Sequence, residues 1–152
     1  MTKNYKSKLK LIDLSNDAVV ASGGGVEEQL LQPDAGYIYK VKNLRINIGD
    51  PAGSSAGTHK IYVRNDPGGT PPWFYMSSNT GSPIYFGYPT TPLKTTATTV
   101  EPDNELEQML SLFHMIASND YPIDFTYVND TDVNQTGTRT IKVLVEEIPE
   151  RA

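Results

Sequence analysis

Two short segments of the sequence contain residue types that could do chemistry. The first, residues 53–57, reads Gly-Ser-Ser-Ala-Gly and matches the G-x-S-x-G pattern of serine hydrolases, with His59 close by. In those enzymes a strand turns sharply into a helix and projects the serine over a parallel sheet. Here the segment lies between two strand-like runs, so we expect a flexible loop and a protein that is not an enzyme.

The second segment, Asp130-Thr-Asp132-Val-Asn134, has the opening spacing of a calcium-binding loop. Gln135 stands where such a loop needs glycine for a sharp turn, and Ile141 stands where a bidentate glutamate would complete the coordination sphere. We therefore expect a solvated loop. The chain has no cysteine and only two distant histidines, His59 and His114, so we expect no metal site and no cofactor.

A cluster of aromatic residues is the clearest candidate for binding. Residues 71–88 contain six of the 14 aromatics in the chain, and the candidates for assembly or ligand contacts are Trp73, Tyr75, Tyr85 and Tyr88. One interpretation is that these rings fill the core or a subunit interface, where tyrosine and tryptophan are enriched. The other is that they form a platform on which sugar rings stack, as in a glycan-binding module or a receptor-binding tip.

The N-terminus is basic. Residues 1–10 contain four lysines and no acid, and Lys3, Lys6 and Lys8 are candidates for assembly contacts. Residues 1–8 are either a solvated tail or an arm that extends onto an acidic neighbour in an assembly.

The elements that must position these residues are short strands. Between residues 37 and 48 the alternation changes phase: Tyr37, Tyr39 and Val41 share one face, and Leu44 and the isoleucines after it share the other. Because side chains alternate strictly along a strand, this change near Lys42-Asn43 predicts a bulge or a passage from one sheet to another.

Later segments also alternate. Residues 121–128 and 138–148 predict two strands, which we expect to form a hairpin around the loop 129–137. Residues 104–110 show helical spacing and predict one short helix, followed by a strand at 111–118.

The whole pattern predicts an all-β protein. With 12 glycines and 11 prolines among 152 residues, it favours eight to ten strands in a two-sheet antiparallel sandwich, most simply a jelly roll. We expect a single domain over residues 9–149, with a C-terminal tail at 150–152.

Composition limits the partners. The formal net charge of −5 argues against binding to duplex nucleic acid, which requires concentrated lysine and arginine. No apolar run has the length of a membrane span, and the start of the chain does not resemble a signal peptide. We expect no nucleic-acid or membrane partner and synthesis in the cytoplasm.

Residues 28–47, from Glu28 to Asn47, resemble small tailed-phage virion proteins in the order of their elements, which are a short strand, a Pro/Gly turn at 33–36 and a longer strand. A Gly/Ser loop and a strand at 58–64 follow, and residues 141–147 resemble the last strand of the same group. The resemblance covers residues 26–64 and 121–148. It implies a capsid decoration protein of jelly-roll type, located on the surface of a phage shell, whose partners are the major capsid protein and copies of itself, with a trimer favoured.

Overall fold

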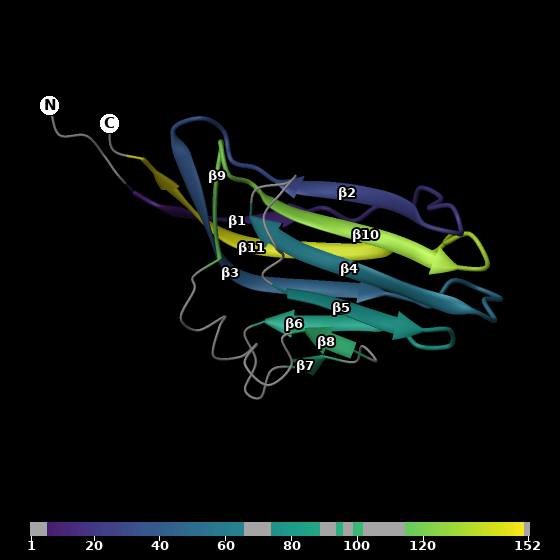
Figure 1. The fold of residues 1–152 in the computed structure, drawn as a ribbon. Helices are drawn as coiled ribbons and strands as arrows, with labels where there is room; N and C mark the ends of the chain where they lie inside the picture. Colours follow the sequence, from purple (N-terminus) through teal and green to yellow (C-terminus); the bar gives the residue numbers. More distant parts are fainter. Residues whose placement is uncertain (1–5, 66–73, 89–93, 96–98, 102–114, 151–152) are drawn as a thin grey trace, which may run out of the picture.

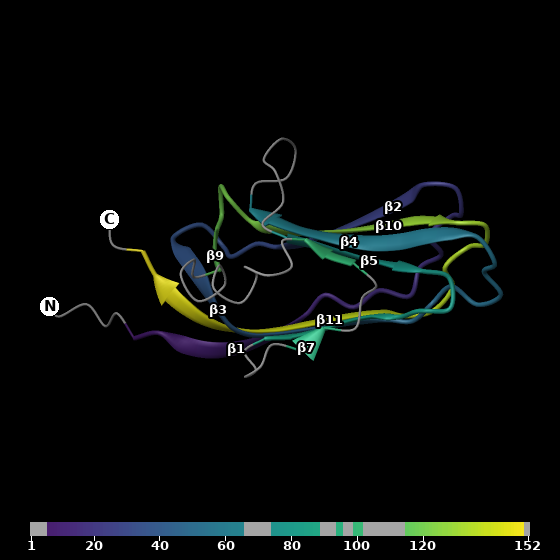
Figure 2. The ribbon, with the colours of Figure 1, turned by 60° about the horizontal axis from the view of Figure 1, so that its bottom comes forward.

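The structure, a computed structural model, describes residues 6–65, 74–88, 94–95, 99–101 and 115–150, and within them it is an all-β sandwich. Two antiparallel sheets lie face to face (Figures 1 and 2). The predicted helix at 104–110 lies outside the described residues.

Each sheet is built from strands that are distant in sequence. The first sheet contains, in spatial order, β1 (Lys8–Asp13), β11 (Arg139–Pro149), β3 (Tyr37–Ile48), β6 (Ile84–Tyr88) and β7 (Lys94–Thr95), with β9 (Ile116–Ser118) beside one end of β3. The second sheet contains β2 (Gly25–Leu31), β10 (Ile123–Thr131), β4 (Gly57–Asn65), β5 (Phe74–Asn79) and β8 (Thr99–Glu101).

The long strands pair in a nested order, the first with the last and the second with the next to last. β1 pairs with β11, β2 with β10, β3 with β6 and β4 with β5. This is the order of a rolled-up antiparallel ribbon, a jelly roll. The eight long strands agree with the predicted range, and three strands of two or three residues bring the described total to eleven.

The core lies between the two inward faces. Most strands alternate buried apolar residues with more exposed ones, as half-buried strands require. In β10 the alternate positions Asp124 and Thr126 are buried polar residues. The fully buried members of the core include Leu44, Ile46, Ile48, Ile61, Val63, Met76, Ile84, Phe86, Ile123, Val143 and Val145.

The phase change in β3 is confirmed, and its cause is a bulge. On β11, Leu144 lies opposite Asn43, and the next residue, Val145, lies opposite Val41. Lys42 is therefore the extra residue. The bulge lets Val41 and Leu44 both face the core while β3 stays in one sheet.

The predicted hairpin of residues 121–128 and 138–148 is wrong. β10 pairs with β2 and β4, whereas β11 pairs with β1 and β3 in the other sheet. The loop between them crosses the gap between the sheets. Each strand lies between two others of its own sheet, so its backbone hydrogen bonds go to strands distant in sequence instead of to each other.

Candidate functional site

Of the lysines predicted as assembly contacts, one precedes the first strand and one belongs to it. Lys6 is exposed, and Lys3 lies outside the described residues. Lys8 and Lys10 belong to β1, where their amines lie 3.5 and 3.0 Å from the carboxylate of Glu147 on β11. The hydrogen bond to Glu147 raises the pKa of Lys10. These two lysines therefore pair with an acid of the same chain, Glu147.

The predicted aromatic cluster does not form one surface in the described part of the chain. Tyr75 lies on the outer face of the second sheet, with its ring centroid 5.4 Å from that of Tyr62. Tyr85 lies on the outer face of the first sheet, opposite the exposed Asn47, and Tyr88 packs inward against the core. Trp73 lies outside the described residues.

The Gly-Ser-Ser-Ala-Gly loop does not form a catalytic pair with His59. The hydroxyl of Ser55 donates to Asp132 Oδ2 at 2.6 Å. His59 is fully buried, and its Nε2 lies 2.9 Å from the carbonyl oxygen of Ser82. A carbonyl only accepts, so Nε2 carries the proton and Nδ1 accepts from the hydroxyl of Tyr127 at 2.9 Å. Both ring nitrogens of His59 are therefore occupied within the sandwich.

The side chains of the segment Asp130 to Asn134 are likewise bound by other residues of the chain. Asp130 pairs with Lys60 at 3.6 Å, Asp132 accepts from the backbone and side chain of Ser55, and Asn134 accepts from the backbone of Ser22 at 3.0 Å. These side chains bind different segments and do not converge on one point. Among the described residues, no group of three or more carboxylates and histidines could hold a metal ion.

Sequence patterns did not indicate the polar network around His59. Gln135 donates from Nε2 to the hydroxyl of Tyr127 at 3.1 Å and to the carbonyl of Gly49 at 2.8 Å. Burial raises the pKa of Tyr127 to about 12. The network joins β4, β10 and three loops at one end of the sandwich, and no periodicity links residues so far apart in sequence.

This network predicts loss of stability in acid. Burial lowers the pKa of His59 from 6.5, although the bond to Ser82 and the charge of Asp50 oppose the shift. The unfolded chain therefore binds a proton that the folded protein excludes. The His59 contribution is fully present above about pH 6.5 and is lost as pH falls through the lower folded pKa, with a slope of at most about 1.4 kcal/mol per pH unit.

Urea unfolding of the wild type and His59→Gln at several pH values measures this contribution. We expect the variant to be less stable near neutral pH, and the difference between the two proteins to shrink as pH falls toward about 5. A difference that stays constant over this range would contradict the assignment.

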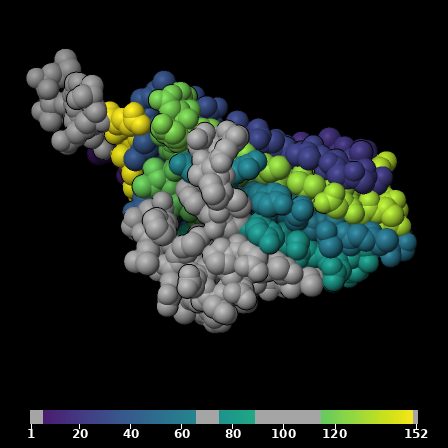
Figure 3. Space-filling model, viewed as in Figure 1, coloured from purple at the N-terminus to yellow at the C-terminus, as the bar shows by residue number. Residues whose placement is uncertain are grey.

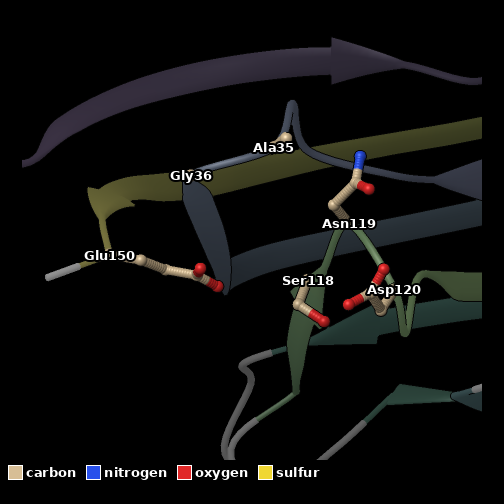
Figure 4. Close-up of a pocket in the computed structure, with 6 residues that line it drawn as sticks. All are labelled: Ala35, Gly36, Ser118, Asn119, Asp120 and Glu150. Atoms are coloured by element: carbon tan, nitrogen blue, oxygen red, sulfur yellow. The ribbon is translucent and has the colours of Figure 1, made fainter. Parts of the chain in front are cut away.

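A shallow hollow of about 280 Å³ lies at the end of the sandwich where β11 finishes. Figure 4 shows Glu150 and Asp120 on opposite sides of Ser118. The Ser118 hydroxyl accepts a hydrogen bond from the backbone of Tyr121 at 3.1 Å, and the described residues that line the hollow include no histidine, lysine or arginine.

The strongest candidate for binding is the edge strand β1. In the described residues it has a neighbour on one side only, β11. Leu9 and Leu11 are 64% and 69% exposed. Leu14 donates to Ile141 on the β11 side at 2.8 Å, and because such bonds alternate along an antiparallel pair, the backbone groups of Leu9 and Leu11 face the open edge.

Such an edge is a template for pairing with another chain. The sequence carried a signal for it, the alternation Lys8-Leu-Lys-Leu-Ile12, but apolar residues in a strand predict a buried face. Only the packing of β1 at the sheet edge shows that these leucines face outward.

The fold and this edge define the protein as a jelly-roll β-sandwich with an exposed apolar edge strand. No family model, no curated protein and no solved structure matches the chain. In the part of the chain that the structure describes, no helix is long and apolar enough to cross a membrane.

Proposed function

We propose that this protein is a non-enzymatic structural component of a phage virion, a decoration protein that binds the assembled shell and stabilises it. The observation that carries the proposal is the exposed pair Leu9 and Leu11 on the open edge of β1. The resemblance of residues 26–64 and 121–148 to small virion proteins supplies the virion context.

Two further features support binding as the mode of action. The serine, histidine and carboxylate groups that could do chemistry are held in hydrogen bonds within the sandwich. Self-association would also cover sheet edges that a monomeric sandwich leaves open, and closed symmetry is the usual arrangement. The major capsid protein and copies of this chain are the proposed partners, on the capsid surface.

Stabilisation follows from linkage. A protein that binds only the assembled shell raises the shell's stability by RT ln(1 + [L]/Kd), so saturating protein shifts the melting of the shell upward. Mixing purified protein with undecorated phage shells tests this by co-sedimentation and calorimetry. Absence of both co-sedimentation and a melting shift would refute the proposal.

The edge leucines give the matched variants. Burying one leucine is worth about 1.5–3 kcal/mol, so Leu9→Ser/Leu11→Ser is expected to weaken shell binding by about 100-fold or more. Val26→Ser is the control, because Val26 is 63% exposed on the edge strand of the other sheet. We expect both variants to melt like the wild type in isolation, since the replaced side chains are exposed.

The assignment of β1 to the binding surface would be wrong if Val26→Ser lost as much shell affinity as the leucine variant, or if the leucine variant lost none.

A further inference from the structure

A row of charged residues crosses the outer face of the first sheet beside the exposed leucines. Asp13 on β1 lies opposite Lys142 on β11, Lys142 lies opposite Arg45 on β3, and Arg45 lies opposite Gly87 on β6. Lys142 points outward because its neighbours in the strand, Ile141 and Val143, are buried.

The two cations in this row are direct cross-strand neighbours. Residues paired in this way have Cβ atoms about 4.5–5.5 Å apart, and like charges there are destabilising. Among the described residues, no ion pair within 4 Å involves Lys142 or Arg45. Asp13, which lies opposite Lys142 on β1, accepts a hydrogen bond from the backbone of Ser15 at 2.9 Å. Hydrogen bonds from Ser15 and the charge of Lys142 lower the pKa of Asp13, so Asp13 offsets Lys142 in part. Arg45 has no acid within ion-pair distance among the described residues.

Arg45 is held in place beside Gly87. A Cβ at position 87 would lie 2.5 Å from Arg45 Nη1 and 3.3 Å from the hydroxyl of Tyr85, so glycine leaves the space that the guanidinium occupies. In the part of the chain that the structure describes, Arg45 Nη1 is buried and has no hydrogen-bond partner. An unsatisfied buried donor is costly, and a small movement toward an arriving carboxylate would satisfy it.

The cations adjoin an apolar strip. Leu144, two residues from Lys142 on the same face of β11, is half-buried and lies opposite the exposed Leu11. We call the surface formed by these residues the docking face. Its members are Leu9, Leu11, Leu144, Lys142 and Arg45.

Charge is distributed unequally between the two sides of the sandwich. On the outer side of the first sheet, the described charged side chains of β1, β3 and β11 are Asp13, Lys40, Lys42, Arg45, Lys142 and Glu146. On the outer side of the second sheet, those of β2, β10 and β4 are Glu28, Lys60, Arg64, Asp124 and Asp130.

The first sheet thus presents a cationic face on a chain of net charge −5. The second sheet, which faces the viewer in Figure 3, is the more acidic side. A basic face with an apolar border complements an acidic partner.

We propose that the docking face binds an acidic protein surface, with a carboxylate between Lys142 and Arg45 and an apolar side chain on the leucine strip. This rests on the proposed function, because it specifies how the chain would meet the shell.

The test uses a charge reversal on each side of the sandwich. Lys142→Glu changes an exposed residue of the docking face, and Lys60→Glu, on the outer face of the second sheet, is the control. We expect Lys142→Glu to weaken shell binding at least tenfold, because it places like charges together, and Lys60→Glu to bind like the wild type. Wild-type binding should also weaken as salt is raised.

Wild-type-like shell binding by Lys142→Glu would overturn the docking face and leave the decoration function standing. If the wild type does not bind shells, the decoration function fails and a second probe decides the docking face. That probe is a synthetic peptide of alternating glutamate and leucine, titrated into the protein and followed by NMR. Salt-sensitive shifts at Leu9, Leu11, Arg45 and Lys142 support the face, and shifts elsewhere or none overturn it.

Discussion

Arg139→Met is expected to lower the free energy of unfolding by about 3–5 kcal/mol, the cost of breaking a buried ion pair by removing one partner. Arg139 extends from β11 in the first sheet and is 1% exposed, and its Nε and Nη2 lie 3.2 and 2.6 Å from the two carboxylate oxygens of Glu27 on β2 in the second sheet. Nη1 donates to the carbonyl of Gly137 at 2.6 Å, and Nη2 donates to that of Ala18. One side chain thus fixes both sheets and the connection between β1 and β2.

The double variant Arg139→Met/Glu27→Met is the matched control. A large part of the single-variant cost is the carboxylate left without its partner, so removing Glu27 as well should recover stability. Urea unfolding measures four proteins, which are the wild type, Arg139→Met, Glu27→Met and the double variant. A single-variant cost below about 1 kcal/mol, or costs of the two single changes that simply add, would contradict a coupled buried pair.

Gly57→Ala is expected to be the second severe substitution. Gly57 begins β4 with φ of +90°, and a Cβ there would lie 2.1 Å from the backbone oxygen of Asp130 on β10. Alanine would therefore meet both a disfavoured backbone conformation, worth about 1–2 kcal/mol, and a clash with backbone that forces β4 and β10 apart, worth about 1–3 kcal/mol.

Gly53→Ala separates these two causes. Gly53 also has positive φ, +81°, but nothing lies within 4 Å of its Cβ position. We expect Gly53→Ala to show only the conformational cost and Gly57→Ala to exceed it by about 1 kcal/mol or more in the same urea experiment. Equal costs would show that the approach of β4 to β10 relaxes without penalty.

The sequence predicted those parts of the fold that depend on neighbours along the chain. Alternation of apolar and polar residues identified β3, β10 and β11. A change in the phase of this alternation located the bulge at Lys42-Asn43, because in a strand with one buried face an extra residue shifts the apolar positions that follow it. Turn residues separated the strands, and these features together gave the sandwich class.

Pairing between strands was decided by the tertiary structure. The loop 129–137 has the composition of a hairpin, yet it crosses between sheets. Asn129, buried near the end of β10, donates to the carbonyl oxygens of Val20 and Val133 at 3.0 and 2.9 Å, which fixes the path of the chain after β10. The contact with Val20 joins residues more than a hundred positions apart, and such a contact produces no repeating pattern in the local sequence.

The candidate site divides in the same way. The sequence by itself determined that the first strand is both basic and apolar, that serine, histidine and acids occur near one another, and that the chain is acidic overall. Only the tertiary structure decided that Leu9 and Leu11 are exposed at an open edge, that Ser55 and His59 have separate partners, and that Lys142 and Arg45 lie side by side. The physical reason is that exposure and cross-strand contact depend on which strands become neighbours, and in a jelly roll those neighbours come from opposite ends of the chain.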